Sequence, residues 1–205
     1  EYINIPDYET ELVTTRYLNA LQVGTVNDSA QWTQEDRRTA LWWIFVNSRD
    51  EAYMTYSYKC GHCGDIHHAD VDMSDLYQTL NLLSVPPYMT CSIPVAGTPV
   101  NWTIKPMTGQ AAELLERVRF AMPPEDHEGY QQALTDLRLS EIVLCTATDS
   151  DPEDYNAAAD KRMEMVKQMS LGHEFPALVA RINLMKTELR HGLDMDVTKF
   201  GVFMN

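Results

Sequence analysis

The stretch "YMTYSYKCGHCGDIHHADVDM" (residues 53–73) reads as two strands on either side of a turn that contains two cysteines. Residues 53–59 alternate in character as a half-buried β-strand does, and residues 65–73 alternate again. The second segment has two sets of side chains on opposite faces: His67, Ala69, Val71 and Met73 on one, and Ile66, His68, Asp70 and Asp72 on the other. The stretch therefore predicts a β-hairpin with the cysteines at its tip.

Cys60 and Cys63 form a Cys-x-x-Cys pair, and a glycine follows each cysteine. Glycines at these places let the backbone curl so that both thiolates face one point, as in a zinc knuckle. A tetrahedral zinc needs two further ligands, and this chain has no second Cys-x-x-Cys to supply them. Candidates are imidazoles on the returning strand, of which one at most should face the cysteines, and distant thiols: His67, His68, Cys91 and Cys145. One structural zinc is the leading interpretation.

Two other interpretations of the cysteine pair stay open: a knuckle that binds no metal, and a redox pair. A thioredoxin-type pair lies at a helix N-terminus that lowers the pKa of its first thiol, whereas this pair is expected between two strands. A hydrolytic zinc would need an open coordination position and a neighbouring carboxylate. Aspartates lie nearby, but their spacing matches no zinc-hydrolase signature such as H-E-x-x-H.

The segments around the hairpin predict an α+β fold. Residues 8–22 have the pattern of an amphipathic helix that Asp7 could cap, and residues 33–49 that of a helix, apolar nearly all round and hence buried, with Thr33 as N-cap. Ser74 is the expected cap of a segment that ends at Pro86 and Pro87. A second hairpin at 88–106 then leads into a helix at 110–122.

Pro123 and Pro124 mark the expected boundary between a mixed α/β lobe (1–122) and a mainly helical lobe (123–205), packed together as one unit. Three helices are predicted in the second lobe, over residues 128–145, 151–169 and 174–192. Asp151 before Pro152 predicts the start of the second, and Gly192 the end of the third. Residues 193–203 return to alternation and predict a closing strand.

Composition excludes several classes of partner. Thirty acidic and sixteen basic side chains give a formal charge of −14, which repels nucleic acid and anionic membranes. The longest apolar run, "ALWWIFV" (40–46), is far shorter than the roughly 18–20 residues that span a bilayer. With no secretion signal at the start, we expect a soluble intracellular protein that binds other proteins or copies of itself.

The order of these motifs resembles that of the baseplate hub assembly proteins of contractile-tailed, T-even-like bacteriophages. The similar features are an apolar helix and strand that run into "YKCGHCGDIHHADVDMSDL" (58–76), the pattern "YMTCSIPVAGTPVNWTIKPMTG" (88–109) before a helix, and the ending "ALVARINLMKTELRHGLDMDV" (177–197). The resemblance implies a virion or assembly factor without enzymatic activity that contacts tail hub, baseplate or tail-tube proteins. It further implies that the knuckle stabilises the fold, and that the protein occurs in the virion tail or in the host cytoplasm during assembly.

The leading hypothesis is therefore a structural or assembly protein of a phage tail, acting through protein–protein contacts. The alternative is a small zinc-dependent enzyme or redox protein that uses Cys60 and Cys63, with His67. A nucleic-acid-binding zinc ribbon would need basic residues around the knuckle, where only Lys59 is close.

Overall fold

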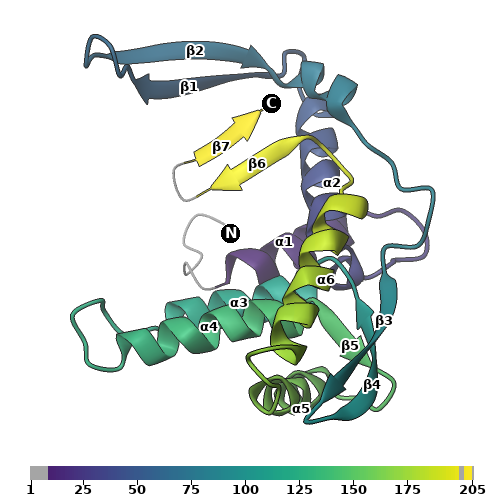
Figure 1. Cartoon of the computed structure of the whole chain (residues 1–205). Helices are drawn as coiled ribbons and strands as arrows, with labels where there is room; N and C mark the ends of the chain where they lie inside the picture. The colour runs from purple at the N-terminus through teal and green to yellow at the C-terminus, as the bar shows by residue number, and fades with distance from the viewer. Residues whose placement is uncertain (1–8, 199–200, 205) are drawn as a thin grey trace. The chain divides into compact units, whose positions relative to one another are not determined.

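The computed structural model describes residues 9–198 and 201–204, with side chains as far as residue 194, and the fold is mixed α+β as predicted (Figure 1). The elements, in which η marks a 3-10 helix, follow in this order: α1 (Thr10–Ala20), η1 (Ser29–Gln31), α2 (Gln34–Asn47), β1 (Tyr53–Lys59), β2 (Ile66–Asp72), η2 (Met73–Thr79), β3 (Met89–Val95), β4 (Thr98–Ile104), α3 (Gly109–Phe120), α4 (Tyr130–Leu144), β5 (Thr146–Thr148), α5 (Tyr155–Lys167), α6 (Glu174–Glu188), β6 (Met195–Thr198) and β7 (Gly201–Met204). Within the described ranges, no helix is both long and apolar enough to span a bilayer.

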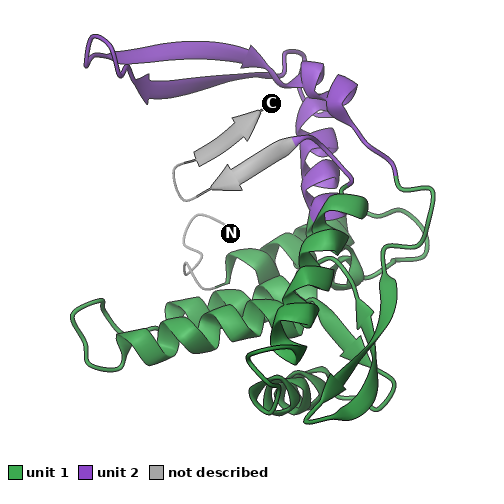
Figure 2. Ribbon diagram, in the orientation of Figure 1, with its two compact units in different colours: residues 1–34, 83–190 green, residues 35–82, 191–205 purple. Residues whose placement is uncertain are grey.

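The chain divides into two compact units, each discontinuous in sequence (Figure 2). Unit 1 comprises residues 1–34 and 83–190, and unit 2 comprises residues 35–82 and 191–205. Pro123, where the sequence predicts a lobe boundary, lies within unit 1 between α3 and α4. These two helices pack against each other, and Arg119 Nη2 lies 2.8 Å from Glu141 Oε1 across the pair. Pro123 and Pro124 therefore lie in the connection between two packed helices of one unit.

Unit 1 is built around a three-stranded antiparallel sheet in the order β3-β4-β5. The predicted second hairpin is confirmed, with a two-residue turn at Ala96 and Gly97, but the third strand, β5, was not foreseen. Trp102 on the central strand is fully buried, and its indole N–H donates to the carbonyl of Ile93 at 3.0 Å. Helices α3 to α6 supply most of the remaining core around this sheet.

Glu174, at the start of α6, ties the β3–β4 turn to the preceding loop. Its carboxylate accepts from the backbone N–H groups of Ser170 at 2.7 Å, Gly97 at 2.9 Å and Ala96 at 3.2 Å. These hydrogen bonds hold the pKa of Glu174 below its usual range, and the N–H of Ser170 has the largest effect. An ionised Glu174 therefore joins segments that are more than 70 residues apart in the chain.

Replacement of Glu174 by Gln is expected to lower the melting temperature by several degrees at neutral pH and to flatten the loss of stability in acid. The folded-state pKa is below the unfolded one, so the carboxylate's stabilisation is complete above about pH 4.3 and disappears as the pH falls through the lower folded value. Thermal melts from neutral pH to about pH 3 measure this. Glu188→Gln, at the exposed end of the same helix, is the matched control. Equal acid profiles for the two variants would contradict the assignment.

Arg162 of α5 lies buried in unit 1, with a side chain only 3% exposed. Its Nε donates to the carbonyl of Ala158 at 3.0 Å, its Nη1 donates to that of Val143 at 2.9 Å, and Asp151 Oδ2 lies 3.3 Å from Nε. A nearby carboxylate and carbonyl acceptors offset the cost of burying a guanidinium. The acidic loop before α5 thus serves as a counter-charge inside unit 1.

The prediction that Asp151 caps α5 is wrong. Asp154 is the N-cap, and its side chain accepts from the backbone N–H of Ala157 at 2.8 Å. Asp151 instead accepts from the hydroxyl of Thr148 at 2.6 Å and from its backbone N–H at 3.1 Å, while it faces Arg162. The helix begins later than predicted because these partners hold Asp151 at the end of β5.

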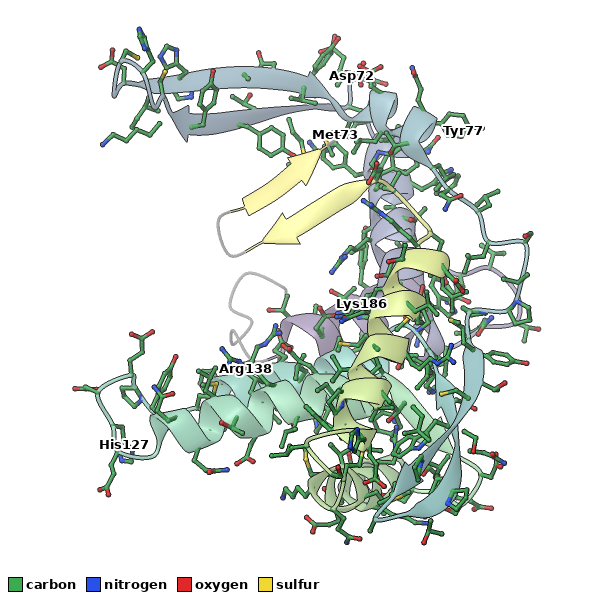
Figure 3. The ribbon with its side chains drawn as sticks, in the orientation of Figure 1. Asp72, Met73, Tyr77, His127, Arg138 and Lys186 are labelled. Atoms are coloured by element: carbon green, nitrogen blue, oxygen red, sulfur yellow. The ribbon has the colours of Figure 1, made fainter. Side chains whose placement is uncertain are left out.

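Unit 2 contains α2, the β1–β2 hairpin, η2 and the β6–β7 pair. Its small core consists of Trp42, Ala52, Met73 and Leu76. The indole N–H of Trp42 donates to the carbonyl of Met73 at 2.7 Å, where η2 begins directly after Asp72 (Figure 3). The expectation that α2 is a buried helix is wrong, because Arg37 and Trp42 alone are buried among the described residues of this helix and the neighbouring Trp43 is 60% exposed.

Other caps and helix ends also differ from the predictions. The cap of η2 is Asp72, which accepts from the N–H of Ser74, the residue predicted to cap. Helix α6 ends at Glu188, four residues before Gly192. Gly192 has a φ of +77° and exchanges two backbone hydrogen bonds with Asn81, and a Cβ there would lie 2.8 Å from Thr39 Oγ1. Glycine is thus required at this position because a side chain would clash with Thr39 and because φ is positive, and not because the residue caps a helix.

The predictions for the two ends of the chain have different outcomes. Asp7, the expected cap of the first helix, lies outside the described residues. The alternating tail forms a pair of antiparallel strands, β6 and β7, instead of a single strand.

Candidate metal centre

The first predicted hairpin is confirmed. Strands β1 and β2 pair antiparallel, with Tyr58 opposite His67 and Ser57 opposite His68. The turn that joins them is closed by two backbone hydrogen bonds, from Cys60 N to Asp65 O at 2.8 Å and from Gly64 N to Cys60 O at 2.9 Å. Gly64 takes a φ of +78°, which a residue with a side chain adopts only with strain. Both cysteines are thus held at the hairpin tip.

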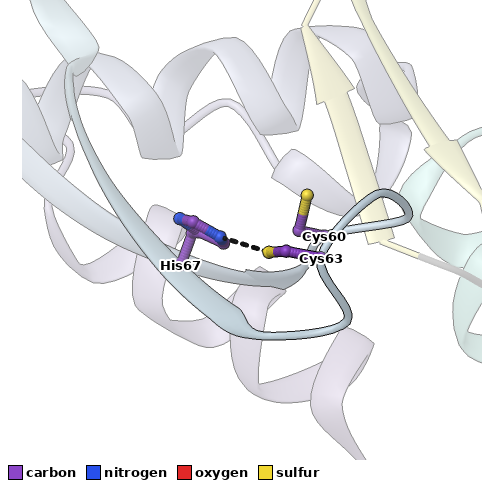
Figure 4. A group of neighbouring side chains, drawn as sticks. All are labelled: Cys60, Cys63 and His67. Carbon is purple, nitrogen blue, oxygen red and sulfur yellow. Dashed lines mark hydrogen bonds between the residues drawn. The ribbon is translucent and has the colours of Figure 1, made fainter.

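Three metal donors converge at this tip: the sulfur atoms of Cys60 and Cys63 and a ring nitrogen of His67 (Figure 4). All three donor atoms lie within 4.8 Å of one another, and Cys63 Sγ lies 3.1 Å from His67 Nε2. In a tetrahedral zinc site, bonds of about 2.0–2.3 Å separate neighbouring donors by about 3.5–3.8 Å. Only small side-chain movements would bring the three donors to these separations, so the group can hold a metal ion.

Local hydrogen bonds favour the thiolate form of Cys60. The backbone N–H of Cys63 lowers the pKa of this thiol most, and the N–H of His62, whose nitrogen lies 3.4 Å from Cys60 Sγ, adds to the effect. A thiolate is the form that binds metals. The backbone of the turn thus directs two amide N–H groups at this sulfur atom.

The structure brings one of the two candidate histidines to the cysteines. His67 lies with them, whereas His68 is on the other face of β2, where its Nδ1 lies 2.8 Å from Ser57 Oγ. The remaining candidates, Cys91 and Cys145, belong to unit 1, and Cys145 is buried in its core. The converging group in the described part of the chain is therefore Cys60, Cys63 and His67.

A further contact of the site was not foreseen from the sequence. The rings of Tyr58 and His67 stack, with centroids 5.7 Å apart and an angle of 23° between their planes. Stacking on one ring face limits the rotation of the imidazole and so keeps Nε2 near Cys63. Cross-strand pairing could have revealed this partner, because His67 lies directly opposite Tyr58.

The hairpin that carries the donors is largely exposed on both faces, although Tyr56 and Val71 near its base are half-buried and Tyr56 packs against the core of unit 2. Residues on one face share an apolar or aromatic character: Met54, Tyr56, Tyr58, His67, Ala69 and Val71. Tyr58 is 55% exposed on this face, and Ile66 is 68% exposed on the other. Two-stranded hairpins without a covered face are marginally stable in water. A bound metal would therefore add stability where packing supplies little.

No protein-family model, curated protein or solved structure matches this chain. The function is therefore inferred from the geometry of the hairpin and from the likeness of motifs described above.

Proposed function

We propose that this protein is a structural or assembly component of a phage tail baseplate hub, without enzymatic activity, that acts through protein–protein contacts. The observation that carries this proposal is the β1–β2 hairpin, which is largely exposed on both faces and gathers three metal donors at its tip. Such a site is suited to stiffen a segment that contacts another protein, since it lies on an exposed turn.

Zinc is the metal that this donor set favours. Two thiolates and an imidazole are typical zinc ligands, whereas calcium and magnesium prefer oxygen donors. Cys60, Cys63 and His67 would hold the ion, and its bonds would close the turn between β1 and β2. We assign the zinc a structural role on this basis.

Placement in a phage tail rests on the likeness of three motifs to those of baseplate hub assembly proteins. A net charge of −14 supports partners that are proteins, because it opposes binding to phosphate backbones and anionic lipid. Tail hub or baseplate proteins are the proposed partners, and the virion tail or the host cytoplasm during assembly is the proposed location.

A small zinc enzyme or redox protein is the second candidate, favoured by the lowered pKa of Cys60 and by a donor set that leaves one zinc position open. Against it, the donor group among the described residues includes no carboxylate to act as acid or base. Cys60 and Cys63 also lie between two strands and not at a helix N-terminus. Reversible oxidation of the pair with dithiothreitol cycling would favour this candidate.

The test is affinity purification of the tagged full chain from cells infected by a phage that encodes it, with partners identified by mass spectrometry. We expect tail hub or baseplate proteins with the wild type and their loss when Cys60 and Cys63 are both replaced by Ser. Cys91→Ser, at a thiol of unit 1, is the matched control and should keep the partners. Absence of the chain both from tail-protein complexes and from particles would contradict the proposal.

A further inference from the structure

The hairpin supplies three of the four ligands that a structural zinc requires. Within the described part of the chain, no other histidine, cysteine or carboxylate joins the converging group. Cys63 and His67 are exposed, so the fourth coordination position faces solvent and is open to a donor from another molecule. The metal site proposed above is thus incomplete within its own hairpin.

His62 is the imidazole best placed to complete the site of another molecule. It lies between the two ligand cysteines, is exposed, and is not among the donors that converge on its own site. Its backbone N–H is directed at Cys60 Sγ, at an N···S distance of 3.4 Å. The His62 side chain is therefore exposed at the hairpin tip, next to the donors of its own site but not among them.

We propose that His62 of one chain is the fourth zinc ligand of a second copy, so that two chains associate through their hairpin tips. In a two-fold symmetric pair, a contact made by one chain is also made by the other. Two His62 side chains would therefore complete two sites, and the assembly would close at a dimer. The inference rests on the metal site of the proposed function and adds self-association to it.

Charge at the tip is compatible with this pairing despite the net charge of −14. Residues 59–68 contain one basic and one acidic side chain, Lys59 and Asp65. A zinc ion offsets the charges of two thiolates, and a fourth neutral imidazole keeps the site neutral, whereas a third thiolate would make it anionic. Repulsion from more distant acidic groups is screened beyond about 8 Å at physiological salt.

Exposed apolar side chains lie beside the tip and would be covered in part by a second hairpin. Tyr58 is 55% exposed and Ile66 is 68% exposed, on opposite faces of the last two residue pairs of the hairpin. Their burial would favour association in addition to the metal–ligand bonds. Contact at the tips alone is small, so the dimer should depend on the metal.

Sedimentation velocity of the full chain, with zinc content measured on the same samples, tests the inference. We expect the zinc-loaded wild type to form dimers with one zinc per chain, and chelation or excess imidazole to return it to monomer. His62→Ala should keep one zinc per chain, but its dimer dissociation constant should rise at least about 100-fold. This expected effect is larger than the roughly 10- to 100-fold loss of metal affinity that follows when an outer-shell partner of a metal site is replaced. His68→Ala is the matched control, since His68 lies in the same hairpin away from the donors, and should dimerise like the wild type.

Several outcomes would overturn the inference. A monomer with one zinc per chain would show that His62 of a second copy is not the fourth ligand, and so would a His62→Ala dimer as strong as that of the wild type. Neither result would contradict the metal site itself. A dimer with one zinc per two chains would show that Cys60 and Cys63 of both copies share a single ion. A chain that binds no zinc would refute the metal site itself, and with it this inference.

Discussion

Replacement of both Cys60 and Cys63 by Ser is expected to abolish zinc binding and to accelerate amide hydrogen exchange in the β1–β2 hairpin by about 100-fold or more. Apart from Tyr56 and Val71 near its base, the hairpin is exposed on both faces, so little packing would hold its tip closed without the proposed metal–ligand bonds. Hydrogen exchange followed by mass spectrometry resolves residues 53–72 from the rest of the chain. Exchange in unit 1, which has its own core, should change little.

Two controls separate metal loss from the substitution itself. Chelator added to the wild type should reproduce the faster exchange in the hairpin, and Cys91→Ser in unit 1 should leave the hairpin unchanged. Equal hairpin exchange in the wild type and the double variant would contradict the proposed structural role of a metal. It would instead favour the interpretation of the turn as a knuckle that binds no metal.

Replacement of Asp151 by Asn is expected to destabilise unit 1 by about 3 kcal/mol, because it leaves the buried Arg162 without its counter-charge. The neighbouring Lys105 is expected to increase this loss of stability. Burial lowers the pKa of this ammonium, Arg162 lowers it further, and Asp151 acts in the opposite direction. Loss of the carboxylate would leave two neighbouring cations in a partly buried place. Urea unfolding of the full chain measures the change in the free energy of unfolding.

The matched control for this prediction is Asp149→Asn, two residues earlier in the same loop. Asp149 accepts an exposed hydrogen bond from the Asn101 side chain at 3.1 Å, and its replacement should cost less than about 0.5 kcal/mol. The double variant Asp151→Asn, Arg162→Met should be less destabilised than Asp151→Asn alone, since it removes the unpaired charge. Equal costs for Asp149→Asn and Asp151→Asn would contradict the role of the ion pair.

Periodicity in the sequence predicted those elements whose environment repeats along the chain. Alternation over 53–73 predicted the first hairpin and assigned His67 and His68 to opposite faces, because successive side chains of a strand always point to opposite sides. The same alternation could not tell which histidine faces the cysteines. That choice depends on the path of the turn, which Gly64 and the two hydrogen bonds of Cys60 and Gly64 define.

Sequence patterns were least informative where long-range contacts compete with a local preference. Asp151 before Pro152 has the local pattern of a helix start, yet the buried Arg162 and the Thr148 backbone engage its carboxylate, and Asp154 caps the helix. Gly192 follows a long helical pattern, yet its pairing with Asn81 and its close approach to Thr39 decide its place. Neither Thr39 nor Asn81 is near Gly192 in sequence.

By itself, the sequence determined the α+β class, the first two hairpins, most helices and the cysteine pair, because these follow from periods of two or 3.6 residues and from local turn chemistry. Only the tertiary structure decided the discontinuous units, the third strand beside β4, the counter-charge of Arg162 and the choice of His67 as the third donor. Each of these depends on which distant segments meet. That is a property of packing in three dimensions, which no local pattern records.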